Sequence, residues 1–543
     1  MQTLCGGLVV AGAASLLPRD GFAADLSLGD RIDLLYSNQF HFDPQGRPRI
    51  SIAVIQGRNE VALSAKGGLS ALPSGDGGTA IAGGGRWRIR VADGQPAKQR
   101  FRLVLDALAA GELRRVASES KRWHERGFEI DEREVGSLFG VAGTVLDTRK
   151  ILLTTAEYSS ESEADKAARE LADRWGILPR LHPEVDRRAS GKLIAEDLET
   201  GVEIQAEGVL WFAPRKDPTV SVHDVECDAG LERRDYRGSI YVAIDRHGKL
   251  AVVNQVGESD VLAGLVPAEI YASAPMEALK AQAVAARGQL LAKIGSRHLD
   301  DPYLLCAHEH CQVYAGTSKE HPRTTDAVER TIGRVLMRPN ETELVDTVYS
   351  ANCGGHSENN EQVWASPADP QLRGQADAKL GEEFSKGIDA NNVEAWLRGN
   401  PDAYSRPPAG KLATSYRWTT TIDPQGIAGK PGVPDNLGKL VQIRVVSRGV
   451  SGRATEVELL GSKSSVTIYG ELKIRQALGG LKSSAFVVDG DRDEQGRFVL
   501  HGGGHGHGVG LCQHGAIGMA GAGKSYGPIL AHYYRGSKIV RLW

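Results

Sequence analysis

The stretch VPAEIYASAPMEALKAQAVAARGQLLAKIG, residues 266–295, holds a glutamate just ahead of a long Ala-rich run. From Met276 onward, apolar and small residues recur at three- and four-residue spacing, which predicts a helix with one closely packed face; they are Leu279, Ala283, Ala286, Leu290 and Ile294. Pro275 suits the first turn of this helix, where its missing N–H group costs nothing. Glu269 is therefore a candidate catalytic carboxyl group, and a solvated acid before a buried helix is the alternative.

A Cys/His-rich segment follows, RHLDDPYLLCAHEHCQVYAG, residues 297–316. Two thiolates and two imidazoles can form a closed tetrahedral zinc site, which leaves no open position for a catalytic water. We predict a structural zinc ion bound by His298, Cys306, His310 and Cys311, with His308 as the alternative histidine. A Cys306–Cys311 disulfide is the competing interpretation for an exported chain.

Two later segments combine glycine with polar side chains. TVYSANCGGHSENNEQVW, residues 347–364, is typical of a strand that runs into a Gly-Gly turn. HGGGHGHGVGLCQHGAIGMAGAGKSYGPILAHYYRGSKIV, residues 501–540, is rich in glycine, which lets the backbone approach a ligand or another strand closely. The interleaved His505, His507, Gln513 and His514 favour the lining of a site over a linker, which would be rich in Ser or Pro.

Together these segments resemble the SpoIID/LytB family, whose founding member is a bacterial sporulation protein that cleaves peptidoglycan. The resemblance covers most of residues 236–543 in the family's order, and five segments carry it: DYRGSIYVAI (235–244), VPAEIYASAPMEALKAQAVAAR (266–287), CAHEHCQVYAG (306–316), YSANCGGHSE (349–358) and GHGHGVGLCQHGAIGMA (504–520). It implies that Glu269 is the catalytic glutamate and that the Cys/His cluster is a zinc site seen in some members. The implied reaction is lytic transglycosylation, in which the MurNAc–GlcNAc bond is cleaved and a 1,6-anhydro ring forms.

This reaction is compatible with a single carboxyl group. Hydrolysing glycosidases usually need two, but the sugar's own hydroxyl can replace water as the nucleophile. We expect an apolar pocket to raise the pKa of Glu269, so that the group is protonated before bond cleavage. The resemblance also implies a set of substrate-binding residues, namely Arg287, Tyr349, Gly354, Gly355, His356, Glu358, His505, His507 and Gln513.

Cys353 and Cys512 stand where many relatives carry Ser, in two segments that we expect to meet at the cleft. This coincidence predicts a Cys353–Cys512 disulfide, which an oxidising compartment would permit. The alternative is a free Cys353 nucleophile activated by His505 or His507, as in a cysteine peptidase or amidase.

The composition indicates an exported protein with several cores. The 543 residues are 41% hydrophobic with a formal net charge of −3, so the chain lacks the positive charge typical of nucleic-acid-binding proteins. Residues 1–24 resemble a signal peptide, which predicts export to the periplasm, the cell wall or the extracellular medium. No later stretch is apolar for long enough to form a transmembrane segment.

We predict an α+β multidomain protein. A β-rich segment, 25–96, precedes a βαββαβ domain, 97–190, which reads as ferredoxin-like and resembles a SPOR domain. A β-hairpin and connector, 191–235, then lead to the SpoIID/LytB-like catalytic domain, 236–543. A ferredoxin-like spacer of another kind is the alternative for the second unit.

The expected partners are peptidoglycan glycan strands, because SPOR modules bind strands stripped of their peptides. A second functional hypothesis is a non-catalytic amidase enhancer that binds murein and activates a cell-wall amidase. A purely structural wall-binding module is a third. The intact Glu269 favours the enzyme.

Overall fold

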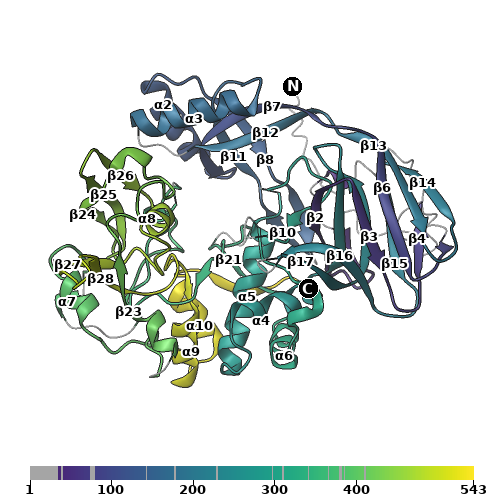
Figure 1. Ribbon diagram of the computed structural model, residues 1–543. Coiled ribbons are helices and arrows are strands. Elements are labelled where there is room, and N and C mark those ends of the chain that lie inside the picture. Colours follow the sequence, from purple (N-terminus) through teal and green to yellow (C-terminus); the bar gives the residue numbers. More distant parts are fainter. Residues whose placement is uncertain are drawn as a thin grey trace, which may run out of the picture.

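The computed structural model describes most of the chain: residues 35–37, 41–73, 80–141, 143–175, 179–227, 230–295, 297–308, 311–339, 342–364, 366–377, 382–384, 386–408 and 411–543. The predicted signal peptide lies outside these ranges. Helices and several separate sheets build the molecule, in agreement with the predicted α+β multidomain class (Figure 1). Among the described residues, no helix is long and apolar enough to cross a membrane.

Two large β-sheets share one apolar core (Figure 1). The first has the order β1 (His41–Phe42), β2 (Pro48–Arg58), β19 (Leu250–Gly257), β18 (Ser239–Ile244), β15 (Val209–Pro214), β4 (Leu69–Leu72) and β5 (Ile81–Ala82), with β20 (Leu305–Cys306) parallel to β2. The second has the order β14 (Glu203–Glu207), β13 (Ser190–Asp197), β6 (Arg86–Gln95), β3 (Glu60–Ser64), β16 (Thr219–Cys227) and β17 (Gly230–Arg237). Buried Ile52, Trp87 and Val242 are among the side chains of both sheets that fill the core.

The predicted consecutive units 25–96, 191–235 and 236–543 do not form separate sheets. β19 pairs with β2, and β18 pairs with β15, so three segments that are distant in sequence build one unit. β6 pairs with β13, and Gln95 stands opposite Ser190. The intervening residues are therefore an insertion that leaves and re-enters the sheet at adjacent positions.

The insertion forms a small sheet covered by two helices (Figure 1). In chain order the elements are β7 (Lys98–Ala109), α2 (Leu113–Glu125), β8 (Asp131–Val135), the hairpin β9 (Leu138–Val141) and β10 (Thr144–Asp147), β11 (Lys150–Thr154), α3 (Glu161–Trp175) and β12 (Arg180–Arg187). The antiparallel sheet has the order β12-β7-β11-β8. Leu103 and Leu105 of β7 pack with Trp123 of α2 and Leu171 of α3. Because side chains alternate along a strand, Arg102 lies on the opposite face.

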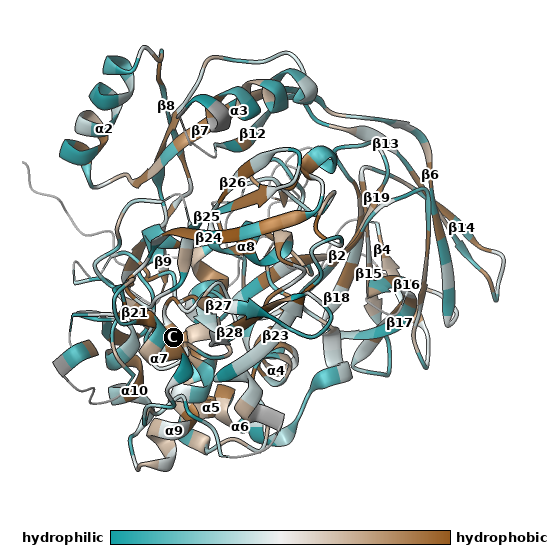
Figure 2. Ribbon diagram, turned by 60° about the vertical axis from the view of Figure 1, so that its left-hand side comes forward, coloured by the Kyte–Doolittle hydropathy of each residue, from teal (hydrophilic) through white to brown (hydrophobic). Residues whose placement is uncertain are grey.

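A group of helices forms the second apolar core, in the lower middle of Figure 1. Its members are α4 (Glu258–Glu269), α5 (Met276–Ala292), α6 (Pro322–Arg330), α9 (Gln513–Gly521) and α10 (Tyr526–Tyr533). α5 begins at Met276, and Pro275 is its N-cap residue, one position before the predicted first turn. α5 is mostly apolar, whereas α2 is largely hydrophilic (Figure 2). Parallel strands β22 (Tyr349–Ser350) and β29 (Leu511–Cys512) bring two distant segments together beside these helices.

The remaining elements include two three-stranded sheets with a shared core. One has the order β23 (Arg417–Ile422), β28 (Phe498–Gly503) and β27 (Phe486–Arg492), and the other the order β24 (Leu440–Arg448), β25 (Ala454–Gly461) and β26 (Ser465–Tyr469). α8 (Glu471–Ala477) packs on the second sheet and α7 (Val393–Arg398) on the first. β21 (Arg334–Met337) pairs with β30 (Lys538–Arg541). Short 3-10 helices span Gly316–Lys319, Asn360–Gln362, Glu382–Phe384, Lys411–Ser415 and Asp435–Leu437.

Candidate functional site

Glu269 is the last residue of α4, and its side chain is half-buried where α4, β22 and the start of α9 meet. The Nε2 group of Gln312 lies 3.2 Å from Glu269 Oε1 and 2.7 Å from the Tyr349 hydroxyl. Gln312 directly follows Cys311, and Tyr349 begins β22. The carboxyl group therefore has an amide and a phenol as close neighbours.

Burial raises the pKa of Glu269 above its ordinary value, as the sequence predicted. The hydrogen bond from Gln312, the charge of Lys293 and the side chains of Tyr349 and Gln513 oppose this shift, and burial outweighs them. A carboxyl group whose pKa is raised keeps its proton to higher pH than an ordinary glutamate and is better suited to act as a general acid.

Polar groups near Glu269 have hydrogen-bonding capacity that the protein does not use. Gln513 donates from Nε2 to Gln282 Oε1 at 3.3 Å. His514 Nδ1 lies 2.7 Å from the carbonyl oxygen of Ala351, so Nδ1 carries the proton and Nε2 is an acceptor. Within the described part of the chain, His514 Nε2 and Gln312 Oε1 are buried without a hydrogen-bond partner. Each atom could accept a hydrogen bond from a polar group that reached it.

Two exposed aromatic rings flank these groups. Tyr271, two residues after Glu269, is 55% exposed, and its ring lies 6.5 Å from the ring of His514. Trp364 is 38% exposed and lies 4.9 Å from the ring of His507. Exposed aromatic faces next to polar groups suit the apolar faces and polar edges of a sugar ring.

His507 holds the segment that carries Tyr349. The backbone N–H of Val509 donates to His507 Nδ1 at 3.1 Å, so Nε2 carries the proton and donates to the Tyr349 carbonyl oxygen at 2.9 Å. Burial lowers the pKa of His507 to about 4, so the ring is neutral at pH 7. His507 thus orients a neighbour of Glu269 through the backbone.

The other two predicted histidines lie differently. His356 is buried, its Nδ1 lies 2.8 Å from the Ser357 carbonyl oxygen, and burial lowers its pKa to about 4. His505 is exposed, and its backbone pairs with that of Asn352. Of these two, only His505 is open to solvent.

Two predicted substrate-binding residues are built into the protein interior instead. Arg287 is fully buried; its Nε donates to Glu258 at 2.5 Å, and its remaining nitrogens donate to the carbonyl oxygens of Thr331, Arg334 and Val328. Glu358 is 1% exposed and accepts hydrogen bonds from the backbone of Asn359, Val450 and Ser451 and from the Ser451 hydroxyl. Neither side chain is placed to contact a sugar.

Gly354 and Gly355 form the predicted turn, with φ angles of 76° and 99°. A Cβ atom at Gly354 would lie 2.9 Å from the backbone nitrogen of Gly504, and one at Gly355 would lie 2.7 Å from the Trp396 ring. Both positions require glycine because of backbone conformation and close packing. The turn is therefore packed tightly against Gly504 and Trp396.

Three of the four predicted zinc ligands meet. One ligand atom each from His298, Cys306 and Cys311 lies within 4.8 Å of the others, and all three side chains are largely buried. Burial alone would lower the pKa of His298, but hydrogen bonding to Asp301 and Cys306 raises it; the His298 Nδ1 to Asp301 distance is 2.8 Å. His310 lies outside the described residues, and the alternative, His308, is exposed.

The chemistry of this cluster fits a divalent metal ion with thiolate and imidazole ligands. A carboxylate on the far nitrogen of a ligating histidine is the usual means of fixing the ring, and Asp301 has this position. A hydrogen bond from Cys311 lowers the pKa of Cys306, which favours the thiolate. The competing Cys306–Cys311 disulfide is not formed in the structure.

Cys353 and Cys512 are also free cysteines, so the predicted disulfide between them is absent from the structure. The two segments do converge as predicted, since the sulfur atoms lie within 4.8 Å of each other. Cys353 is only 3% exposed, and burial raises the pKa of its thiol well above normal. The nucleophile alternative needs an accessible thiolate of low pKa and has no support in this geometry.

Comparison with known proteins agrees with this arrangement. Residues 246–337, which contain Glu269 and the His298 cluster, match the family model described as "Stage II sporulation protein", SpoIID. An amidase enhancer of Bacillus subtilis (strain 168) is 28% identical over 305 residues, 51% of this chain and 40% of that protein. Stage II sporulation protein D of the same strain is 27% identical over 301 residues, 53% of this chain and 75% of that protein. The region that contains Glu269 and the His298 cluster is therefore SpoIID-like, and similarity to SpoIID and amidase-enhancer proteins extends over about half of the chain.

Two further similarities extend the comparison. An uncharacterized protein of Brachyspira hyodysenteriae (strain ATCC 49526 / WA1) is 29% identical over 307 residues, 56% of this chain and 72% of that protein. Residues 358–510 match a domain of unknown function, DUF8618. This second match covers the two three-stranded sheets, whereas the SpoIID match covers α4, α5 and the Cys/His cluster.

Three residues at the SpoIID-type site were missed by sequence reasoning. Gln312 contacts Glu269, Gln282 contacts Gln513, and Trp364 covers His507. Gln312 directly follows Cys311 in the Cys/His-rich segment, and this position was the only hint in the sequence that Gln312 lies near a functional site. Gln282 is a polar residue on the buried face of an Ala-rich helix, where a polar group requires a partner.

Proposed function

We propose that this SpoIID-like protein is a peptidoglycan lytic transglycosylase that cleaves MurNAc–GlcNAc bonds. The observation that carries the proposal is Glu269, a half-buried carboxyl group of raised pKa whose hydrogen-bonding neighbours are Gln312, Tyr349 and Gln513. Those neighbours are amides and a phenol rather than a second acid. A lone acid suits a reaction in which the sugar supplies its own nucleophile.

The reaction needs one proton donor that later becomes an acceptor. Protonated Glu269 donates its proton to the glycosidic oxygen, the bond from that oxygen to C1 of MurNAc breaks, and GlcNAc leaves as an alcohol. The C6 hydroxyl oxygen then bonds to C1, and its proton passes to the Glu269 carboxylate. The product carries a 1,6-anhydro ring, and Glu269 is protonated again.

The surrounding groups supply orientation. Gln312 and Tyr349 fix the Glu269 carboxyl group, and Gln312 Oε1 and His514 Nε2 remain for hydroxyl or N-acetyl N–H donors of the substrate. Tyr271 and Trp364 offer ring faces on which sugars can stack. Orientation of this kind lowers the barrier by positioning the reacting atoms.

The test is digestion of purified, peptide-free glycan strands followed by mass analysis of the products. Anhydro ends are lighter by one water than hydrolytic ends. Glu269→Gln keeps the shape of the side chain and removes the proton donor, so activity should fall by at least about a hundredfold. Glu329→Gln, on an exposed residue of α6, is the matched control. Wild-type turnover in Glu269→Gln would contradict the proposal.

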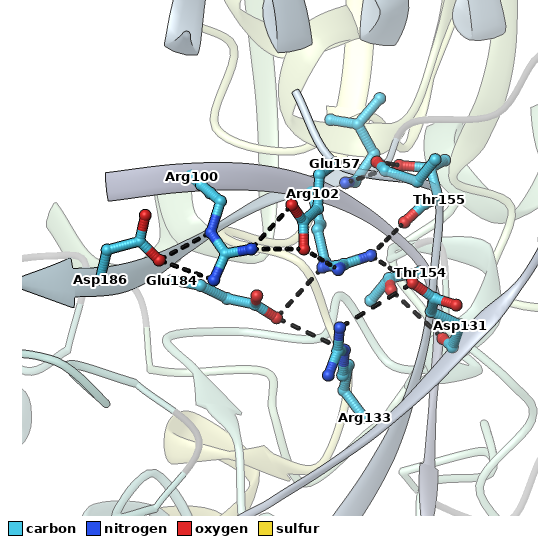
Figure 3. A network of polar contacts seen from close by, with 11 residues as sticks. Arg100, Arg102, Asp131, Arg133, Thr154, Thr155, Glu157, Glu184 and Asp186 are labelled. Atoms are coloured by element: carbon cyan, nitrogen blue, oxygen red, sulfur yellow. Dashed lines mark hydrogen bonds and ion pairs between the residues drawn. The ribbon is translucent and has the colours of Figure 1, made fainter. Parts of the chain in front are cut away.

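We also infer that the inserted unit is a ferredoxin-like, SPOR-like module that binds peptide-stripped strands. The order β7, α2, β8, β11, α3, β12 and the sheet order β12-β7-β11-β8 support this inference. On the sheet face opposite the helices, arginines and acids pair with each other (Figure 3): Arg100, Arg102 and Arg133 alternate with Asp131, Glu157, Glu184 and Asp186. Because these charges are satisfied internally, glycan binding would rely on hydrogen bonds more than on net charge.

Gln95 and Ser190 are paired, so the module can be removed without separating the flanking strands. A variant that joins Gln95 to Ser190 through a short Gly-rich turn should retain cleavage of dissolved strands and lose sedimentation with peptide-stripped sacculi. Full sedimentation of this variant would place murein binding elsewhere in the chain.

A non-catalytic amidase enhancer is the second candidate, and the named relative of Bacillus subtilis is the observation in its favour. In that case the protein would accelerate a purified cell-wall amidase on intact sacculi, and Glu269→Gln would leave the acceleration unchanged. A cell-wall role requires export, which fractionation of cells that express the full-length chain would test.

A further inference from the structure

A second cluster of metal-type ligands lies apart from the His298 cluster. The sulfur atoms of Cys353 and Cys512 and a carboxylate oxygen of Asp377 all lie within 4.8 Å of one another. The three residues are 3%, 1% and 1% exposed. The parallel pairing of β22 with β29 places Cys353, three residues after β22, beside Cys512.

Asp377 lacks the partners that a buried carboxylate requires. Its Oδ1 accepts a hydrogen bond from the Tyr533 hydroxyl. Its Oδ2 is buried and has no hydrogen-bond partner within the described part of the chain. His532 Nε2, which likewise makes no hydrogen bond there, lies 3.8 Å from Oδ1. An uncompensated buried carboxylate is costly, so an unpartnered oxygen on a carboxyl group that lies beside two sulfur atoms indicates a missing cation.

The sulfur of Cys512 is held as an acceptor. The backbone N–H of Cys353 donates to Cys512 Sγ at 3.1 Å, and that of Gly515, in the first turn of α9, donates at 3.3 Å. Backbone donors and the positive end of a helix stabilise a thiolate, the form that binds metal. A disulfide would consume both thiols and leave Asp377 without a counter-charge.

We propose that Cys353, Cys512 and Asp377 bind a thiophilic divalent cation of the Zn²⁺ type. In a tetrahedral zinc site with Zn–S bonds of about 2.3 Å, ligand atoms lie roughly 3.5–3.8 Å apart, which the observed spacing reaches with a small contraction. The fourth position is open to a water molecule or to His532. The ion cross-links the Gly354 turn, the Asp377 segment and the start of α9.

Such an ion would hold the walls of the Glu269 site together. Gln513, a neighbour of Glu269, directly follows Cys512, and Tyr349 lies four residues before Cys353. The ion's role is structural, because its protein ligands are buried and Glu269 needs no metal. The inference stands whether or not the chain cleaves glycan.

The experiment is metal analysis of the full chain purified without chelators. We expect Cys512→Ser and Asp377→Asn each to bind about one Zn²⁺ fewer per chain than the wild type. Cys227→Ser removes a half-buried thiol outside both clusters and should leave the zinc content unchanged. Reconstitution with Co²⁺ should give a thiolate charge-transfer absorption that weakens in Cys512→Ser. Equal zinc content in all variants would overturn the proposal.

Wild-type protein gives a second measurement if a variant fails to fold. After removal of metal by a chelator, Cys353 and Cys512 should be alkylated, and added Zn²⁺ should protect both. Peptide mapping of unreduced protein that finds a Cys353–Cys512 disulfide, or alkylation that Zn²⁺ does not change, would also overturn it.

Discussion

Replacement of Arg287 by Met tests whether this residue supports the fold or binds substrate. Its guanidinium group is fully buried and pairs with Glu258, which is 1% exposed, at 2.5 Å. Three backbone carbonyl groups accept its other hydrogen bonds. In Arg287→Met the Glu258 carboxylate and these carbonyls would remain buried without their donor.

The expected cost is about 3–5 kcal/mol of unfolding free energy, the usual range when one partner of a buried ion pair is removed. This is a large fraction of the roughly 5–15 kcal/mol that stabilises a typical domain. Glu258→Met should cost a similar amount for the reciprocal reason. The double variant removes both charges, so its cost should fall below the sum of the single costs by about 1–3 kcal/mol.

Urea unfolding gives the free energies, and hydrogen-exchange mass spectrometry of α4 and α5 shows whether the loss is local to these helices. Glycan binding is measured on the folded fraction by sedimentation. If Arg287→Met keeps wild-type stability and exchange protection yet binds strands weakly, Arg287 contacts substrate and the structural reasoning is refuted. Additive costs in the double variant would show that the Arg287–Glu258 pair is uncoupled.

Three further outcomes follow from other parts of the structure. The kcat/KM of cleavage should decline as pH rises through the raised pKa of Glu269, because the acid must be protonated. Gln312→Ala removes a hydrogen bond that lowers this pKa, so the decline should move to higher pH, and a pH-independent kcat/KM would contradict the reasoning. Chelation or Cys306→Ser should lower the melting temperature, since metal affinity is coupled to folding, and elemental analysis should find zinc in the untreated protein. Arg102→Met should destabilise the inserted unit by about 1–2 kcal/mol in urea, because three partly exposed acids lose their shared partner. No change would show that the pairs contribute nothing.

Local sequence patterns predicted the structure correctly where residues that are close in the chain also interact in space. The spacing of apolar residues after Pro275 determines α5, and the residue order in 97–190 determines two helices between strands. At the start of α3, Ser160 Oγ accepts a hydrogen bond from the Glu163 N–H at 3.2 Å, which is a contact between near neighbours in the chain. The metal-ligand candidates His298, Cys306 and Cys311 lie within a short segment, so residue type and closeness in the chain together predicted a common site.

Tertiary structure decided what depends on contacts between distant segments. The carboxylate partner of Arg287 lies 29 positions away, and the turn at 449–451 that holds Glu358 lies more than 90 positions away. The sequence alone therefore does not show which polar side chains are buried in the interior and which lie at the Glu269 site; the tertiary contacts decide this. Asp377 shows the same limit, because no local pattern joins it to Cys353 and Cys512. Burial, which raises the pKa of Glu269 and keeps Glu358 in the interior, is a property of the packed chain and not of any single segment.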